Sequence, residues 1–96
     1  MTSKQRSHLK SIAATMKPIA QVGKDGVSEN VVSSLSDALE ARELVKINLL
    51  PASGEDAMES ARELESALKA QLVAVIGRKA ILYRRSSRPD FEHIEF

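Results

Sequence analysis

Two short apolar runs, at residues 44–50 and 72–76, constrain the fold of this chain most strongly. Both are rich in Leu, Val and Ile, a composition typical of buried strands. The segment between them, residues 55–70, has apolar positions at helical spacing, namely Ala57, Ala61, Leu64 and Leu68. A strand–helix–strand unit of this kind predicts parallel strands joined by a right-handed connection. We expect the 55–70 helix to be the longest in the chain or nearly so.

The N-terminal segment predicts a helix followed by a short strand. Thr2 and Gln5 have the spacing of a capping box. Apolar residues then recur at helical spacing, at Leu9, Ile12, Ala13 and Met16. Pro18 stops this helix, because the residue before a proline is disfavoured in helical conformation. Residues 19–22 then form a strand candidate that precedes Gly23.

The remaining elements complete an α-β-α-β-α-β-β order. Ser28 is placed as the N-cap of a second helix that runs to about Arg42. A tight turn at 77–79 leads into a last strand at 80–83, which makes the four-stranded sheet mixed. A chain of 96 residues has room for one core of ordinary size. We therefore predict one compact α/β domain over residues 1–85 and a loosely held tail over 86–96.

Charge is strongly segregated along the chain, although the net charge is only +1. Residues 1–24 hold five basic and no acidic side chains, and residues 76–88 again hold five basic and none acidic. Residues 25–75 hold four basic and ten acidic side chains. This pattern predicts a basic face for an anionic ligand, on which the N-terminal lysines and the later cations meet, and a separate acidic face.

Composition argues against several classes of function. The chain has no cysteine, which excludes disulfide scaffolds and thiolate chemistry. It has no apolar run of membrane-spanning length and no apolar signal-peptide core, so we expect a cytoplasmic protein without membrane contact. His8 and His93 have no matched nucleophile, and the acidic residues near His93 lack distinctive metal spacing. We therefore expect no enzyme activity, cofactor, metal or small-molecule substrate.

The sharpest local feature is the loop Gly23-Lys24-Asp25-Gly26, between the first strand and the second helix. Glycines let a backbone approach a bulky partner closely, and a helix N-terminus presents free amides to phosphate. Lys24 adds a full positive charge, whereas Asp25 suits such a site only if its side chain points away from the ligand. A simple strand-to-helix turn is the alternative interpretation.

Further cations are candidates for the same ligand. Arg78 and Lys79 occupy the predicted hairpin turn, and Arg84 follows the last strand. They either contact an anionic ligand or form a solvated cluster that protects a strand edge from aggregation. Lys46 is a lone charge within an apolar strand. It is either a residue of a half-exposed sheet face or a ligand contact on that face.

Four segments, in order and at these spacings, resemble a known family, the CRM domain (chloroplast RNA splicing and ribosome maturation) in its stand-alone, YhbY-like bacterial form. The segments are Met16-Lys17-Pro18-Ile19, residues 22–28 (VGKDGVS), residues 41–47 (ARELVKI) and residues 75–84 (VIGRKAILYR). The resemblance covers about residues 3–85. It departs from the family at Arg42, where histidine usually precedes the Glu-Leu pair.

This resemblance implies an α/β fold similar to the C-terminal domain of bacterial translation initiation factor three. It also implies RNA binding through the GxxG loop and neighbouring basic residues, and a role in large ribosomal subunit assembly, with ribosomal RNA and precursor particles as partners. The expected RNA-binding residues are Gly23, Lys24, Asp25, Gly26, Lys4, Lys10, Lys17, Lys46, Arg78, Lys79 and Arg84. The cations among them would contact phosphates rather than read bases. With only three aromatic residues, recognition by base stacking is not expected.

Two other functions compete with this interpretation. The first is a protein-interaction module that docks a ribosomal protein or an assembly GTPase through the acidic face of the 55–65 helix. The second is a translation-factor fragment that acts on the small subunit. In each case we expect a monomer.

Overall fold

The computed structural model describes residues 1–23, 26–50 and 56–95. Lys24 and Asp25 of the predicted GxxG loop lie outside the described residues. The elements follow the predicted order: α1 (Ser3–Ala14), β1 (Ala20–Val22), α2 (Glu29–Arg42), β2 (Leu44–Leu49), α3 (Ala57–Leu68), β3 (Gln71–Ile76) and β4 (Lys79–Tyr83). The chain forms a single α/β domain with a four-stranded mixed sheet, as predicted.

Side-chain caps begin the first two helices where the sequence predicts them. The Gln5 amide donates to Thr2 Oγ1 (3.1 Å) and the Thr2 amide to Gln5 Oε1 (2.9 Å), which completes the capping box. The Val31 amide donates to Ser28 Oγ at the start of α2 (3.2 Å).

The third helix is shorter than the range of 55–70 that the sequence suggests. Asp56 acts as its N-cap, so the helix begins at Ala57, and Lys69 ends it in a left-handed conformation with φ 53°. As a result α2, with 14 residues, is the longest helix of the described chain, and α3 has 12.

The sheet has the strand order β1-β2-β4-β3. Strands β1 and β2 are parallel, with Ala20 opposite Ile47, and both partners of β4 are antiparallel to it. The expectation that each crossover gives a parallel pair is therefore wrong for β2 and β3, because β4 lies between them. Strand β4 lies inside the sheet, between β2 and β3, and four of its five residues are buried.

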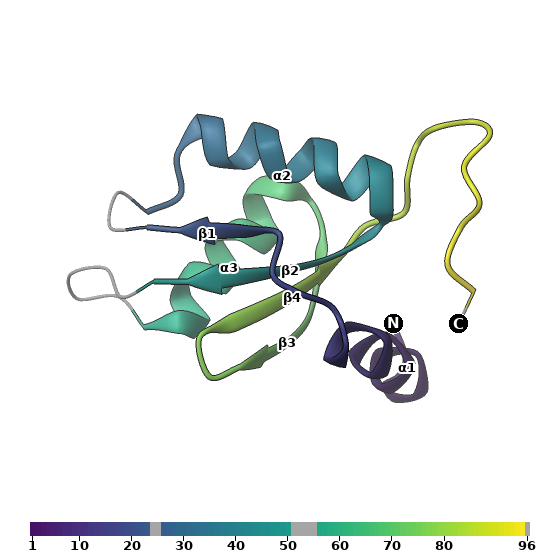
Figure 1. The fold of residues 1–96 in the computed structure, drawn as a ribbon, viewed down its shortest axis with the longest axis horizontal. Helices are drawn as coiled ribbons and strands as arrows, with labels where there is room; N and C mark the ends of the chain where they lie inside the picture. The colour runs from purple at the N-terminus through teal and green to yellow at the C-terminus, as the bar shows by residue number, and fades with distance from the viewer. Residues whose placement is uncertain (24–25, 51–55, 96) are drawn as a thin grey trace.

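Helices cover both faces of the sheet (Figure 1). One core lies between the sheet and helices α2 and α3, and it includes Leu39, Leu64 and Leu82. A second core lies under α1, where Leu9 and Ala13 pack on Leu44 and Ile81. Alternation along the strands assigns each side chain to one core, so Ile81 faces α1 and Leu82 faces α3.

Candidate nucleic-acid interface

Three separate chain segments meet at one end of the sheet. The Leu50 amide donates to the Val22 carbonyl (2.9 Å), which joins the ends of β2 and β1. The Leu49 amide donates to the Arg78 carbonyl (2.7 Å), which joins the end of β2 to the β3–β4 turn. Gly23, directly after β1, and the β3–β4 turn therefore lie at the same end of the sheet, on the left in Figure 1. We call this end, defined by Gly23, Gly26, Leu50, Arg78 and Lys79, the loop end.

Gly23 and Gly26, which we call the glycine segment, have an open environment at the loop end. The Gly26 amide donates to the Gly23 carbonyl (3.0 Å), and Gly26 has φ +72°, in the region that favours glycine. A Cβ atom placed at either glycine would meet none of the described residues within 4 Å, which favours close approach of a ligand to the backbone there. The N-terminus of α2 follows directly, which brings its amides and the positive end of its dipole to this surface.

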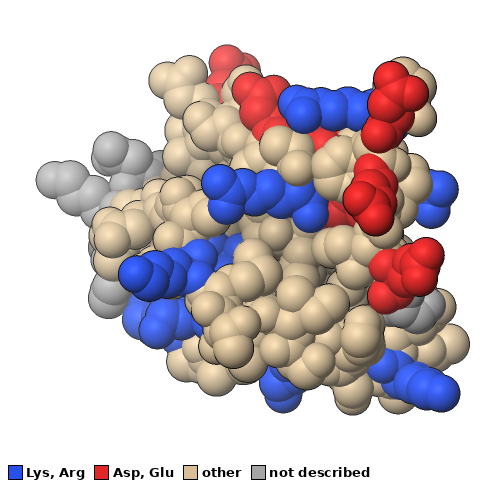
Figure 2. Space-filling model, turned by 45° about the vertical axis from the view of Figure 1, so that its right-hand side comes forward, with Lys and Arg blue, Asp and Glu red and all other residues tan. Residues whose placement is uncertain are grey.

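Two of the predicted cations lie at the β3–β4 connection, Arg78 in the turn and Lys79 as the first residue of β4. Gly77 has φ +61° and allows the tight turn. Arg78 Nε donates to the Leu49 carbonyl (2.5 Å), which holds the turn against β2, and the Lys79 side chain is exposed. Figure 2 shows several basic side chains along the left of the molecule, while most acidic side chains of this view gather along its top and right.

The N-terminal lysines lie on the surface of α1 or just beyond it, and the structure does not gather all of them at the loop end. Lys4, Lys10 and Lys17 are exposed. Lys4 lines a hollow with His8 of α1 and Glu95 of the C-terminal tail. The N-terminus lies on the side of the molecule opposite the loop end (Figure 1). The expectation of one continuous basic face is therefore wrong for Lys4.

Two further predicted cations donate to the carbonyls of helix ends. Lys46 Nζ donates to the carbonyls of Ala13 (3.1 Å) and Met16 (3.2 Å) at the end of α1. Arg84 donates to the Leu68 carbonyl (2.9 Å) at the end of α3, and to the carbonyl and hydroxyl of Ser36 (3.0 and 2.9 Å). Ala13 and Leu68 lie in the last turns of α1 and α3, where the helix dipole favours a nearby cation. Both side chains therefore have a structural role.

Sequence reasoning missed Arg6, a third cation whose side chain donates to backbone carbonyls. Arg6 Nη1 donates to the carbonyls of Leu72 (2.6 Å) and Val73 (2.9 Å) on the edge strand β3. The pairing of β3 with β4 is irregular at this point, between Leu72 and Ala74. Arg6 therefore occupies polar groups of a strand edge that would otherwise be open to another chain. An isolated arginine on a predicted helix carries no sequence signal for this role.

The sequence also gave no sign of the buried acid Glu43, which follows α2 with φ 64°. Its side chain is 0% exposed and accepts from the amides of Ser86 (2.7 Å) and Ile94 (2.8 Å) and from His93 Nδ1 (2.5 Å). Burial raises the pKa of Glu43, but these hydrogen bonds outweigh burial and hold the pKa below its ordinary value. This one carboxylate thus fixes both ends of the segment 86–94.

Glu40, one turn earlier in α2, is partly exposed and also accepts hydrogen bonds from the tail. It accepts from the Ser87 amide (2.7 Å) and from the Ser87 hydroxyl. These hydrogen bonds from Ser87 lower the pKa of Glu40. Ile94 packs against the core under α1, so the tail that we expected to be loosely held has contacts on both α1 and α2. We call this region, defined by Glu40, Glu43 and residues 86–94, the tail end.

Two structural features bear on other functions. Within residues 1–23, 26–50 and 56–95, no three His, Asp or Glu side chains are grouped so that they could hold a metal ion. Among the helices of the same described part, none combines the length and apolar character that crossing a membrane requires.

Comparison with known proteins defines the class of this domain. The CRS1/YhbY (CRM) domain matches residues 1–84, and the chain belongs to this family. It is 42% identical over 86 residues to the probable RNA-binding protein YqeI of Bacillus subtilis, covering 90% of each chain. It is 33% identical over 90 residues to the probable RNA-binding protein PA4753 of Pseudomonas aeruginosa, covering 94% of this chain and 86% of that one.

A solved structure has the same fold. The solution structure of the hypothetical protein SAV1595 from Staphylococcus aureus superposes with a TM-score of 0.79 and 39% sequence identity, and the match covers 94% of each chain. The predicted fold class and family are therefore confirmed.

Proposed function

We propose that this protein binds RNA through its loop end and acts on ribosomal RNA in precursors of the large ribosomal subunit, where it assists assembly. The observation that carries the RNA part is the meeting of the glycine segment, the N-terminus of α2 and the basic β3–β4 turn at one end of the sheet. The relatives named as RNA-binding proteins support it. The resemblance to stand-alone YhbY-like proteins supports ribosomal RNA as the target.

The chemistry of the loop end suits the RNA backbone better than the bases. Backbone amides near Gly26 and the α2 N-terminus can donate to phosphate oxygens, and Lys79 can neutralise a neighbouring phosphate. Lys24, which stands between the two glycines in the sequence, would add a further charge. Lys10 and Lys17 would extend the positive field, while Lys46 and Arg84 would act indirectly by holding helix ends in place.

A titration of structured ribosomal RNA at two salt concentrations tests the RNA part. Binding through phosphates weakens as salt rises, because the release of each bound counterion gains less entropy in a more concentrated salt solution. Lys79→Gln should lower the affinity for all RNA sequences about equally and reduce the slope of log affinity against log salt by about 0.7–0.9. Arg88→Gln removes an exposed cation of the tail and is the matched control. Equal effects of the two variants, or a change of sequence preference, would contradict the proposed contact.

The ribosomal part needs a separate experiment. Tagged protein should sediment with precursors of the large subunit, and Lys79→Gln should reduce this fraction. Co-sedimentation with the small subunit would overturn the proposed target but leave RNA binding intact. This outcome would favour the competing role of a translation-factor fragment.

A further inference from the structure

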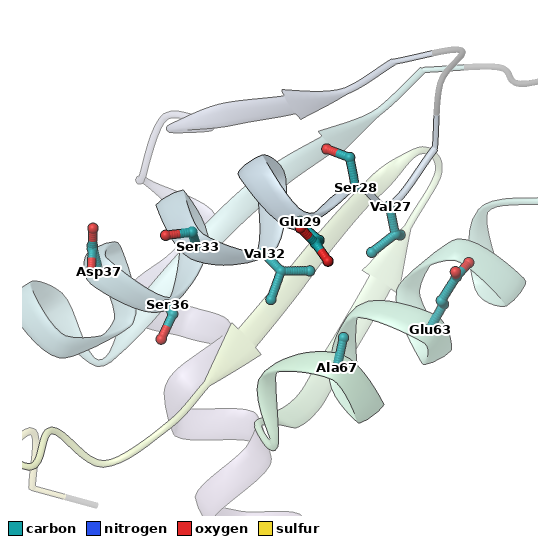
Figure 3. A pocket seen from close by; sticks show the side chains of 9 residues that line it. All are labelled: Val27, Ser28, Glu29, Val32, Ser33, Ser36, Asp37, Glu63 and Ala67. Atoms are coloured by element: carbon teal, nitrogen blue, oxygen red, sulfur yellow. The ribbon is translucent and has the colours of Figure 1, made fainter.

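A groove of about 550 Å³ runs between helices α2 and α3 and begins at Val27, directly after Gly26. Its apolar part is formed by Val27, Val32 and Ala67 (Figure 3). Ser33 and Ser36 of α2 also line it. Val32 is half-buried and packs on the core, while the Ala67 side is open to solvent. The groove therefore offers a small apolar surface that nothing within the described chain covers.

The charged residues that line this groove are all acidic: Glu29, Asp37 and Glu63. Figure 3 shows Glu29 of α2 and Glu63 of α3 approaching the space near Val27 from the two helices. All three side chains are exposed, so they keep their charge available to a partner.

Two cations beside the groove residues, Arg62 and Arg84, are engaged within the chain. Arg62, next to Glu63, forms an ion pair with Glu65 (2.9 Å). Arg84 donates to Ser36 and Leu68, at the end of the groove that Ser36 lines. The groove thus presents carboxylates around an apolar floor, and its charge is opposite to that expected of the loop end.

We propose that this groove binds a lysine- and arginine-rich segment of a partner protein. An apolar side chain of that segment packs on Val32 and Ala67, and its cations face Glu29 and Glu63. Charge complementarity carries the choice of partner, because the charged groove residues beyond the first turn of α2, Asp37 and Glu63, repel an RNA backbone and attract a basic segment. Since Val27 follows Gly26 directly, a basic protein that is itself bound to the RNA could reach the groove while the loop end holds the same RNA.

The test is a titration of isotope-labelled protein, followed by NMR, with a short amidated peptide of lysines around one leucine. A peptide with serine in place of the leucine is the first control. The leucine peptide should shift the amide signals of Val32, Ser36 and Ala67 and should bind more tightly than the serine peptide. Glu63→Lys should weaken its binding about fivefold, because an attractive pair becomes repulsive. Asp90→Lys makes the same change of charge on the exposed tail and should have little effect.

A second variant fills the groove without altering charge. Ala67→Leu keeps a good helix former at an exposed position. It should weaken binding of the leucine peptide and leave the affinity for RNA unchanged. Ala67→Met serves the same purpose if Ala67→Leu does not fold.

Two outcomes would overturn the proposal. The first is equal binding of both peptides with equal weakening by Glu63→Lys and Asp90→Lys, which would mean diffuse attraction between opposite charges. The second is an Ala67→Leu variant that binds RNA more weakly but binds the peptide normally. This result would make the groove part of the RNA-binding surface. Failure of Lys79→Gln to affect RNA would contradict the proposed function and leave this groove untouched.

Discussion

The loop end and the tail end of this domain both concentrate charged side chains, but the two ends use charge differently. At the tail end, Glu43 is fully buried and accepts three hydrogen bonds from the chain itself. At the loop end, Lys79 is exposed and the backbone around Gly26 is open. A charge whose hydrogen bonds are satisfied internally stabilises the fold, whereas one that faces solvent remains available to a partner.

The same distinction separates the predicted cations. Lys46 and Arg84 looked like candidates for RNA because they are basic residues in or beside strands. Their charged groups donate to carbonyls at the ends of α1 and α3. Like Glu43 at the tail end, they form their hydrogen bonds within the chain. Position in the sequence did not reveal this, because each contact joins residues that lie far apart along the chain.

The largest expected effect comes from Glu43→Gln. The substitution removes the charge and replaces one acceptor oxygen by a donor that faces the donors of Ser86, His93 or Ile94. We expect the free energy of unfolding to fall by about 2–4 kcal/mol, measured by denaturant titration. RNA affinity measured well below the new melting temperature should stay unchanged.

Glu92→Gln is the matched control for Glu43→Gln, since Glu92 is an exposed acid of the same tail. It should leave stability nearly unchanged. An equal loss in both variants would show that net charge, rather than the buried hydrogen bonds, is responsible.

Acid should also destabilise the protein, because it protonates Glu43. The loss of stability should be smaller than in Glu43→Gln, because the protonated side chain keeps both of its oxygen atoms. The pKa of Glu43 is lowered from its ordinary value of 4.5, so the ionised form is favoured in the folded state. Its contribution to stability is therefore complete above about pH 4.5 and is lost as the pH falls through the lower, folded-state pKa. Melting temperatures between neutral pH and pH 3 should decline less steeply in Glu43→Gln. Parallel curves for the two proteins would contradict this.

The sequence predicted the fold well because most of its signals are local. Caps such as Thr2–Gln5 and Ser28, the two apolar runs and the stripe of α3 each depend on neighbours within a few residues. The place of β4 between β2 and β3 could not be predicted, because it depends on packing across the whole sheet.

The parts of the candidate site that the sequence reveals are also local. Gly23, Gly26 and the turn with Arg78 and Lys79 are visible as local patterns, and the structure brings them to one end of the sheet. The roles of Arg6 and Glu43 depend on partners more than 40 residues away, so no spacing rule identifies them.

At the loop end we expect Lys24→Asp to separate function from stability. The variant places a second carboxylate before the N-terminus of α2, where a negative charge costs little or is mildly favourable. The free energy of unfolding should change by less than about 1 kcal/mol. RNA affinity should fall at least about tenfold, or about 1.4 kcal/mol, because an anion would replace a cation near phosphate. Both quantities should be measured on one preparation, and normal RNA binding would show that residues 23–26 form only a turn.

The smallest expected effect distinguishes the two glycines of the loop end. Gly26 has φ +72°, so Gly26→Ala forces an L side chain into an unfavourable conformation and should cost about 1 kcal/mol of stability. Gly23 does not have this positive φ, and a Cβ there meets open space, so Gly23→Ala should be nearly neutral in thermal unfolding. RNA affinity should nevertheless fall in Gly23→Ala, because the added methyl group limits how closely a phosphate approaches the backbone. If Gly23→Ala binds RNA like the unaltered protein while Gly26→Ala only loses stability, the glycines serve the turn alone, and the contact with RNA would rest on the cations of the loop end.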